Sequence, residues 1–219
     1  MAVNSIYNDC YFSIENGFEE SKSVFVCTNG VVEKAKSSKN LTIGELGFGT
    51  GLNLLATLEC ISFPCEIQYY SVEKHPPSKE QIDEIIGEYS PKNYAQYLQF
   101  YDELFRNLKH GFNSAIWQFG EITVNFNLYF GDVLDFLDEL DTQIDCWYLD
   151  GHAPEKNPDM WSEDVCRKVY DKSKVGTTAG TYTACGFVKQ NLRAAGFFVK
   201  RQKGFGGKRH KLFAERSQV

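Results

Sequence analysis

A chain of 219 residues and 25.0 kDa, 42% hydrophobic and 15% aromatic, is long enough to bury the core of one folded domain. No apolar stretch is long enough to cross a bilayer, and the first ten residues lack the basic-then-apolar pattern of a secretory signal. Seven cysteines without a Cys-x-x-Cys pair disfavour a metal site and a disulfide framework, so we expect a cytoplasmic protein that needs no metal.

Charge is distributed unevenly along the chain, whose net charge is −6. The segment Lys189–Arg216 contains nine Lys or Arg and one acid, Glu215, and therefore carries +8. The remaining 14 bases and 28 acids give −14. A basic segment in an acidic chain predicts an anionic partner at that end, and the alternative is an ordinary solvated surface.

The N-terminal part of the chain predicts a small β extension. Within residues 5–34, the aromatic-rich Asp9–Ser13 and the apolar Ser23–Thr28 are typical of short strands. Asn29–Gly30 is typical of a turn. We therefore expect a β hairpin region ahead of the main sheet.

A glycine turn follows. The apolar run Leu41–Leu46 breaks into glycines at 47, 49 and 51 and then resumes as an apolar, helix-like segment from Leu52. Glycine is suited to such a turn because it adopts backbone angles that other residues avoid, and because a ligand can approach a backbone without Cβ atoms. This pattern predicts a strand, a tight turn and a helix N-terminus that binds a nucleotide-like cofactor.

Strands and helices alternate through the rest of the chain. Ser78 in a capping position and apolar residues at Ile82, Ile85 and Ile86 predict helix within residues 78–108, as part of a mainly helical insertion over 76–121. The further expected strands are Ile67–Glu73, Ile122–Phe130, Ile144–Leu149, Thr177–Thr183, Phe197–Gln202 and Lys211–Glu215. The further expected helices are Val133–Leu140 and Cys185–Ala195.

This alternation predicts an α/β fold. We expect a Rossmann-like, seven-stranded and mostly parallel sheet with helices on both faces, in a single domain over residues 1–219. Ligands of such sheets bind beyond the carboxyl ends of the strands. The candidate site therefore lies at the edge that carries the glycine turn.

Three successive expected strands end in an acid, at Glu73, Asp132 and Asp150. Each acid alone is common as a turn former or a helix cap, but their convergence on one edge favours a binding role. Glu73 can accept both hydroxyls of a ribose. Asp132 can accept an adenine amino group, with Val133 supplying a backbone N–H. Asp150 is expected beside the first strand, near the reacting group.

The spacing of the glycines indicates which cofactor binds. Gly47-x-Gly49-x-Gly51 differs from the dinucleotide fingerprint Gly-x-Gly-x-x-Gly. Glu45 would repel a pyrophosphate but attract the ammonium of a methionine moiety. The arrangement resembles the first motif of class I S-adenosylmethionine-dependent methyltransferases. The residues expected to bind S-adenosylmethionine are Tyr11, Glu45, Gly47, Phe48, Gly49, Gly51, Asn53, Glu73, Lys74, Asp132, Val133 and Asp150.

Four longer motifs extend this resemblance in chain order, from about residue 9 to 213. They are Asp9–Ser13, Ser71–Pro76, Tyr148–Trp161 and Gly204–Arg209. Together they resemble the methyltransferase domain of the bacterial tRNA 5-methylaminomethyl-2-thiouridine biosynthesis enzymes. This resemblance implies S-adenosylmethionine-dependent methylation of the aminomethyl group on a tRNA wobble uridine, in the anticodon loop. Some members carry a flavin-dependent oxidase domain, so for this stand-alone form we expect a separate flavin-dependent oxidase as a partner.

Two positions depart from the family pattern. His152 stands where the family usually has Phe, and Gly207 stands where we expect a basic residue. We assign Asp150 as the catalytic residue, because a carboxylate can accept a hydrogen bond from the amine and hold its lone pair toward the methyl group. His152 and Trp161 are expected to stack on the uridine, and the alternative for both is a packing role.

The basic segment supplies the expected contacts to tRNA phosphates. These residues are Lys200, Arg201, Lys203, Lys208, Arg209 and Lys211. Two other functions share the cofactor residues: a class I methyltransferase that acts on a small amine or a protein, and a non-catalytic nucleotide-binding or RNA-binding module. A nicotinamide-dependent dehydrogenase has the wrong glycine spacing.

Overall fold

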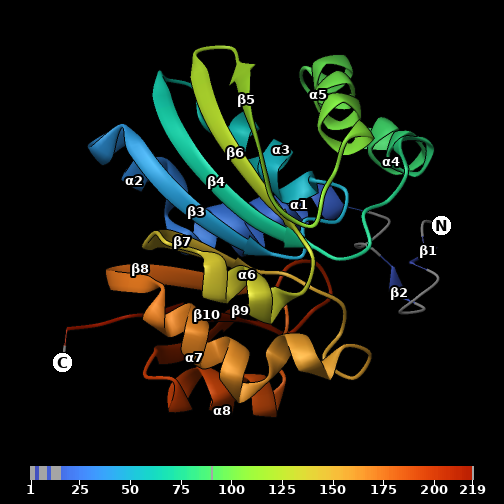
Figure 1. The fold of residues 1–219 in the computed structure, drawn as a ribbon. Helices are drawn as coiled ribbons and strands as arrows, with labels where there is room; N and C mark the ends of the chain where they lie inside the picture. Colours follow the sequence, from blue (N-terminus) through green and yellow to red (C-terminus); the bar gives the residue numbers. More distant parts are fainter. Residues whose placement is uncertain (1–2, 5–8, 11–15, 90, 219) are drawn as a thin grey trace.

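A mixed eight-stranded β-sheet forms the centre of the computed structural model, which describes residues 3–4, 9–10, 16–89 and 91–218 (Figure 1). The strand order is β5-β6-β4-β3-β7-β8-β10-β9. The five strands from β6 to β8 are parallel, whereas β5, at one edge, and β10, between β8 and β9, run antiparallel to their neighbours. The α/β fold with a mostly parallel sheet is therefore confirmed.

The strands of this sheet are β3 (Asn40–Leu46), β4 (Cys65–Glu73), β5 (Gly111–Phe119), β6 (Ile122–Phe130), β7 (Ile144–Leu149), β8 (Ser173–Thr181), β9 (Phe198–Lys203) and β10 (His210–Glu215). A separate pair consists of β1 (Val3–Asn4) and β2 (Asp9–Cys10). The helices are α1 (Gly17–Ser21), η1 (Lys22–Cys27), α2 (Val31–Ser38), α3 (Leu52–Cys60), α4 (Lys79–Ile86), η2 (Gly87–Tyr89), α5 (Tyr94–Arg106), α6 (Val133–Glu139), η3 (Pro158–Trp161), α7 (Glu163–Asp171) and α8 (Gly186–Ala194). None of these described helices is both long and apolar enough to span a membrane.

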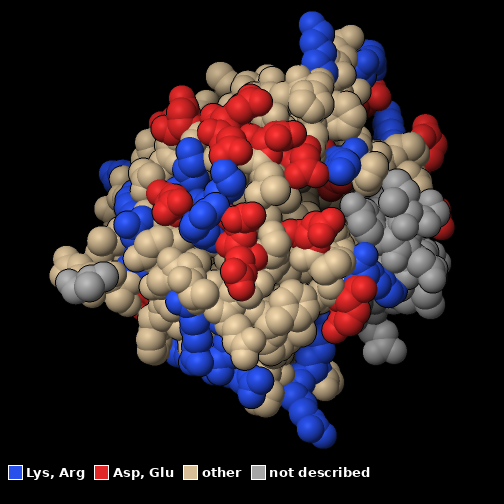
Figure 2. Space-filling model, turned by 60° about the horizontal axis from the view of Figure 1, so that its bottom comes forward, with Lys and Arg blue, Asp and Glu red and all other residues tan. Residues whose placement is uncertain are grey.

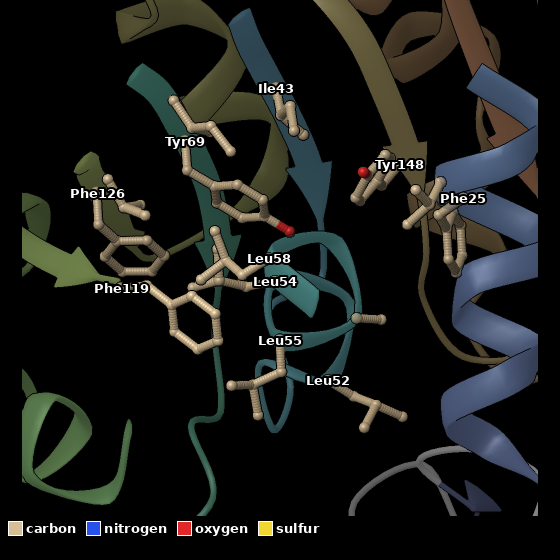
Figure 3. Close-up of a cluster of buried hydrophobic side chains, with 14 of the residues drawn as sticks. Phe25, Ile43, Leu52, Leu54, Leu55, Leu58, Tyr69, Phe119, Phe126 and Tyr148 are labelled. Atoms are coloured by element: carbon tan, nitrogen blue, oxygen red, sulfur yellow. The ribbon is translucent and has the colours of Figure 1, made fainter. Parts of the chain in front are cut away.

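Helices cover both faces of the sheet. On one face, α6, α7 and α8 pack on the sheet around the fully buried Trp147 (Figure 1). On the other face, α3 and the N-terminal helices bury a second, aromatic-rich cluster. In Figure 3, Leu54 and Leu58 of α3 lie beside Tyr69 and Phe126 of the sheet. This two-sided burial holds the carboxyl ends of the parallel strands in fixed positions.

The expected β hairpin region over residues 5–34 is wrong from residue 17 onward. Gly17–Ser38 is helical except at Gly30, where the turn expected at Asn29–Gly30 is found, and the expected strand Ser23–Thr28 lies within and just after a π-helical turn. β-branched residues gave this segment a strand-like pattern, but Phe18, Phe25 and Val31 are buried on helical spacing against the sheet. Tertiary packing therefore overrides the local preference. Of the motif at 9–13, β2 covers 9–10, and residues 11–15 lie outside the described residues.

The expected count of seven strands needs correction, because the mainly helical insertion over 76–121 also contains an eighth strand, β5. Its side chains alternate toward its end: Trp117 and Phe119 are buried, whereas Ile116 is 75% exposed. Such alternation is typical of an edge strand. The helical part does begin as expected, since Ser78 caps α4 through a capping box with Gln81.

The remaining strand expectations are confirmed to within a few residues. β6 and β7 have the expected bounds, and β4 and β8 begin earlier than expected. The expected position of β7 beside β3 is also confirmed, with Glu45 opposite Tyr148 in the register.

Close packing between β3 and β7 makes Gly44 sensitive to substitution. A Cβ at Gly44 would lie 2.4 Å from the Trp147 ring, whose Nε1 donates a hydrogen bond to Ser173 Oγ at 3.0 Å. We expect Gly44→Ala to lower the free energy of unfolding by about 2–3 kcal/mol or more through overpacking, measured by urea denaturation. Gly186→Ala is the control, because nothing lies within 4 Å of its added Cβ, and equal stability of the two variants would contradict this packing.

Candidate active site

A cavity of about 550 Å³ opens at the carboxyl edge of the parallel strands. Its volume is in the range of small-molecule sites. Its lining comes from the segments that follow β3, β4, β6, β7 and β8, from the N-terminal helices and from the turn before β10. The sequence-predicted residues that line it are Gly47, Phe48, Gly49, Asn53, Glu73, Lys74, Asp132, Val133, Asp150, His152 and Lys208. Tyr11 lies outside the described residues.

The glycine turn brings three strand ends together. The N–H groups of Gly47 and Phe48 both donate to Val72 O, at 3.1 and 3.0 Å. Gly47 has φ +90°, and its Cβ would lie 3.0 Å from Asp150 O, so glycine here lets the loop after β7 approach β3. Gly51, at φ +74°, does not line the cavity, and a Cβ there would lie 2.0 Å from the Tyr97 hydroxyl. Its contribution is to the packing of the turn.

Glu73 stands at the end of β4 and faces the glycine turn. Its Oε2 accepts a hydrogen bond from Gly49 N–H at 2.8 Å, and its Oε1 accepts one from His75 N–H at 2.7 Å. Each carboxylate oxygen has further lone pairs, so the group can also accept hydrogen bonds from a ligand in the cavity. The position matches the one expected for a ribose-binding acid.

Asp132 has both of the roles considered from the sequence. It caps α6 by accepting from Leu134 N–H at 3.0 Å, and it lines the cavity beside Lys74, whose Nζ is 3.2 Å from Asp132 Oδ2. Burial alone would raise the pKa of Asp132, but the hydrogen bonds from Leu134 N–H and Lys74 outweigh it and lower this pKa. The carboxyl group is therefore an ionised acceptor at neutral pH.

A side-chain amide joins two acids at the ends of neighbouring strands. Nδ2 of Asn53 donates to Glu45 Oε1 at 2.9 Å and to Asp150 Oδ2 at 2.7 Å. Ser21 Oγ donates to Asn53 Oδ1 at 2.6 Å, and Ser71 Oγ donates to Glu45 Oε2 at 2.8 Å. Because an amide oxygen only accepts, the bond from Ser21 fixes which end of Asn53 faces the acids.

Burial makes both acids weak. It raises the pKa of Glu45 to about 8, against the opposing hydrogen bonds from Asn53 and Ser71. It raises the pKa of Asp150 to about 7, against the hydrogen bonds from Asn53 and Gly151 N–H. Asp150 therefore exchanges its proton near neutral pH, which suits a group that handles a proton in a reaction.

The direct contact expected between Glu45 and an ammonium group is not supported by the geometry. Glu45 is fully buried and does not line the cavity, because Asn53 lies between its carboxyl group and the ligand space. Glu45 can affect a ligand only through Asn53 and Asp150. The sequence shows that Glu45 lies two residues ahead of the glycine turn, but the burial of its side chain depends on how α3 packs against the sheet.

The loop after β7 combines lining and packing residues. His152 lines the cavity, whereas Trp161 is 3% exposed and donates from Nε1 to His152 O at 3.1 Å. The expected stacking of Trp161 on a base is therefore wrong. Trp161 instead packs in the core and fixes the loop through its hydrogen bond to His152 O. A second hydrogen bond fixes this loop: the hydroxyl of Tyr182, in the segment after β8, donates to Gly151 O at 2.6 Å.

The six basic residues expected at tRNA phosphates do not form one surface. Lys211 is 7% exposed and donates to Ser23 O at 2.5 Å, so its expected phosphate contact is wrong. On β9, Lys200 lies over the Phe213 ring on one face of the sheet, and Arg201 and Lys203 alternate to the other face. Figure 2 shows Lys and Arg along the lower edge of the face that it presents and also among Asp and Glu in its upper half, so the basic residues do not form one patch on this face.

The turn between β9 and β10 carries the other two expected phosphate contacts. Lys208 lines the cavity, and Arg209 beside it is exposed. Of the six basic residues, only Lys208 lines the cavity. Its positive charge lowers the pKa of Asp150.

Sequence reasoning missed the contribution of the N-terminal helices. Glu20 and Ser21 of α1 line the cavity, as do Tyr182 and several residues of the loop after β7. Two adjacent acids ahead of a run of apolar residues are compatible with a helix start. That signal was outweighed by the strand-like composition of Ser23–Thr28.

The raised pKa of Glu45 predicts a pH-dependent stability. Between its unfolded value of about 4.3 and its folded value of about 8, the folded state holds a proton that the unfolded state has lost, so stability falls as pH rises. Glu45→Gln removes this titration, and we expect its free energy of unfolding relative to the parent to rise by about 3–5 kcal/mol between about pH 5 and pH 8. Urea denaturation at several pH values measures it. Glu121→Gln, at an exposed carboxylate, is the control, and parallel pH profiles for parent and Glu45→Gln would refute the assignment.

Comparison with known proteins agrees with this geometry. Residues 94–217 match the family model described as S-adenosyl-L-methionine-dependent methyltransferase. The chain is 37% identical over 213 residues to the tRNA 5-methylaminomethyl-2-thiouridine biosynthesis bifunctional protein MnmC of Ectopseudomonas mendocina, covering 94% of this chain and 32% of that protein. It is 34% identical over 239 residues to the protein of the same name from Actinobacillus pleuropneumoniae, covering 99% and 34%. The chain thus spans about a third of the length of these relatives.

The fold has a solved counterpart. The crystal structure of MNMC2 from Aquifex aeolicus superposes with a TM-score of 0.76 at 22% identity, covering 99% of this chain and 67% of that one. Together, the matched family model and the site at the carboxyl edge of the sheet place this chain in the S-adenosyl-L-methionine-dependent methyltransferase family.

Proposed function

We propose that this protein transfers a methyl group from S-adenosylmethionine to the 5-aminomethyl group of a tRNA wobble uridine, the final step to 5-methylaminomethyl-(2-thio)uridine. The observation that carries the proposal is Asp150: a buried carboxyl group on a cofactor-sized cavity, held by Asn53 and Gly151, with a pKa of about 7. The names of the relatives indicate tRNA as the substrate class, and methylation of tRNA by this chain is our proposal.

The residues of the cavity fit S-adenosylmethionine. Glu73 would accept the ribose hydroxyls, and Asp132 with Val133 would contact the adenine. Asn53 and Asp150 would lie near the methionine end, where carboxylate oxygen complements a positively charged ligand. The cofactor, when bound, supplies an electrophilic methyl group on a sulfonium.

Asp150 has the chemistry to prepare the amine. A protonated alkylamine has no lone pair, so a nearby acceptor must take its proton or hold its hydrogen bond before the nitrogen can attack. The Asp150 carboxylate can do both, and it stabilises the positive charge that develops on the nitrogen. Asn53 and Gly151 fix the orientation of this carboxylate, since each of its oxygens accepts one of their N–H groups.

His152 and the basic turn supply the proposed nucleic-acid side of the site. His152 lines the cavity on the loop after β7, where an extruded base would enter. Lys208 lines the cavity, Arg209 follows it in the chain and is exposed, and Lys203 is exposed at the end of β9. These residues are our candidates for phosphate contacts. The flavin-dependent oxidase partner stays a prediction from the sequence.

The reaction itself can be tested directly. With labelled S-adenosylmethionine and tRNA that bears the 5-aminomethyl precursor, we expect label in 5-methylaminomethyl-(2-thio)uridine after nucleoside analysis. The control is the same tRNA with the methylated nucleoside already in place, which should take up no label. Label in a small amine or a protein but in neither tRNA would favour the alternative methyltransferase function. Tight binding of the demethylated cofactor without turnover on any RNA would favour a non-catalytic module.

Removal of the acidic acceptor tests the mechanism. Asp150→Asn keeps the shape of the side chain but cannot take a proton, so we expect turnover to fall by about two orders of magnitude or more, with cofactor affinity within a few-fold of the parent. In the parent, turnover should rise with pH through about 7 as Asp150 loses its proton. Single-turnover kinetics and calorimetry measure the two quantities, and equal turnover of variant and parent would remove Asp150 from the mechanism.

The salt dependence of binding tests the nucleic-acid partner. If the exposed basic residues neutralise phosphates, the affinity for tRNA should fall by about one power of salt concentration for each phosphate contacted. Lys203→Gln should lower the slope by about one, and Lys211→Gln should leave it unchanged because Lys211 is buried. An affinity for tRNA that does not change with salt would exclude this mode of binding.

A further inference from the structure

A buried carboxylate, outside the residues expected from the sequence, faces the same cavity as Asp150. Glu20 of α1 is 7% exposed and lines the cavity. Its Oε1 accepts a hydrogen bond from Lys208 Nζ at 2.5 Å. Because both members of this ion pair line the proposed methyl-transfer site, a ligand that enters the cavity can change their pairing.

The two members of this pair differ in how firmly they are held. Glu20 lies on a helix that is packed against the sheet, next to Ser21, which holds Asn53. Lys208 is 48% exposed in its side chain and lies on a turn that contains Gly206 and Gly207. The Lys208 ammonium, at the end of four methylene groups, is therefore the partner that can leave, whereas the carboxylate is fixed.

Lys208 also makes contact with the loop of the catalytic acid. Its Nζ lies 5.1 Å from the centre of the Tyr182 ring, and the Tyr182 hydroxyl donates to Gly151 O. The charges of Glu20 and Lys208 both reach Asp150: beyond the effects of burial and hydrogen bonds, Glu20 raises the pKa of Asp150 and Lys208 lowers it. A cation on Glu20 is thus part of the electrostatic environment of Asp150.

We propose that Glu20 binds the ammonium form of the substrate amine by displacing Lys208, so that Glu20 and Asp150 hold the amine together while Lys208 turns outward to a substrate phosphate. This inference rests on the function proposed above. The exchange replaces one ammonium by another on the same carboxylate, so the net charge of the cavity does not change. Before attack, one proton passes from the ammonium to Asp150, which leaves a neutral amine and a neutral carboxyl group.

The exchange gives the site a selectivity that a phosphate contact alone cannot supply. An anionic nucleic acid without an amine offers Lys208 a phosphate but leaves Glu20 as an unpaired, buried carboxylate, which is costly. A free amine without phosphate satisfies Glu20 but must compete with Lys208. A substrate that carries both groups satisfies both residues at once.

The test compares two anticodon stem–loops that differ only in the wobble substituent, 5-aminomethyl or 5-hydroxymethyl, bound in the presence of S-adenosylhomocysteine so that no turnover occurs. Their phosphates are the same, so the ratio of the two affinities reports the amine alone. Because a charge-assisted hydrogen bond is lost, we expect Glu20→Gln to reduce the preference for the amine by about tenfold or more. The affinity of the variant for S-adenosylhomocysteine should stay within a few-fold of the parent.

Lys208→Met distinguishes exchange from a merely structural ion pair. It keeps most of the aliphatic length but removes the ammonium, so we expect both stem–loops to bind more weakly by a similar factor, with the preference for the amine kept or increased. Glu19→Gln, one residue away and exposed, is the matched control and should change neither quantity. If Glu20→Gln does not unfold cooperatively, Glu20→Asp, which keeps the charge on a shorter side chain, should show a partial loss of preference.

Three results would overturn the inference. The first is an unchanged amine preference in Glu20→Gln, or in Glu20→Asp where that variant is used. The second is an equal loss of preference in Lys208→Met. The third is a loss of cofactor affinity in Glu20→Gln with an intact amine preference, which would assign Glu20 to the cofactor. Failure of the proposed function is recognised separately, because the parent would then not methylate the 5-aminomethyl stem–loop with S-adenosylmethionine.

Discussion

The amide of Asn53 is the contact on which the arrangement of the site depends. Its nitrogen donates to carboxyl groups at the ends of two neighbouring strands, Glu45 on β3 and Asp150 after β7, and its oxygen accepts from Ser21. One side chain at the start of α3 therefore joins two strands and an N-terminal helix. Because every polar atom of this amide has a partner, the network can be buried without leaving an unsatisfied group.

Burial of two acids beside one amide also determines the chemistry. Without a cationic ligand, low polarity favours the protonated form of both Glu45 and Asp150. A positive charge that enters the cavity favours their ionised forms, so cation binding and proton release are linked. A cationic ligand in the cavity would thus make Asp150 a better hydrogen-bond acceptor. Glu45 does not line the cavity and is joined to Asp150 through the Asn53 amide.

The sequence predicted the parts of the fold and site that depend on local pattern. The glycines at 47, 49 and 51 and the acids that end β4 and β7 could be assigned because the backbone of a strand–turn–helix unit is determined by near neighbours. The burial of Glu45 and Trp161 could not, because it depends on helices that arrive from other parts of the chain. The helical form of Ser23–Thr28 was missed for the same reason: its composition favours a strand, and only its packing against the sheet favours a helix.

The basic segment is the case in which composition was informative but position was not. Its charge suggested a single surface, yet strand alternation sends Lys200 and Arg201 to opposite faces, and Lys211 is buried against Ser23. What remains at the cavity is the turn between β9 and β10, which brings Lys208 to Glu20. Of the six basic residues expected at phosphates, this turn therefore leaves one ammonium, that of Lys208, in the cavity lining beside Glu20. In the exchange proposed above, Lys208 would attract a phosphate of an anionic partner while Glu20 selects its amine, so both steps would take place at one ion pair.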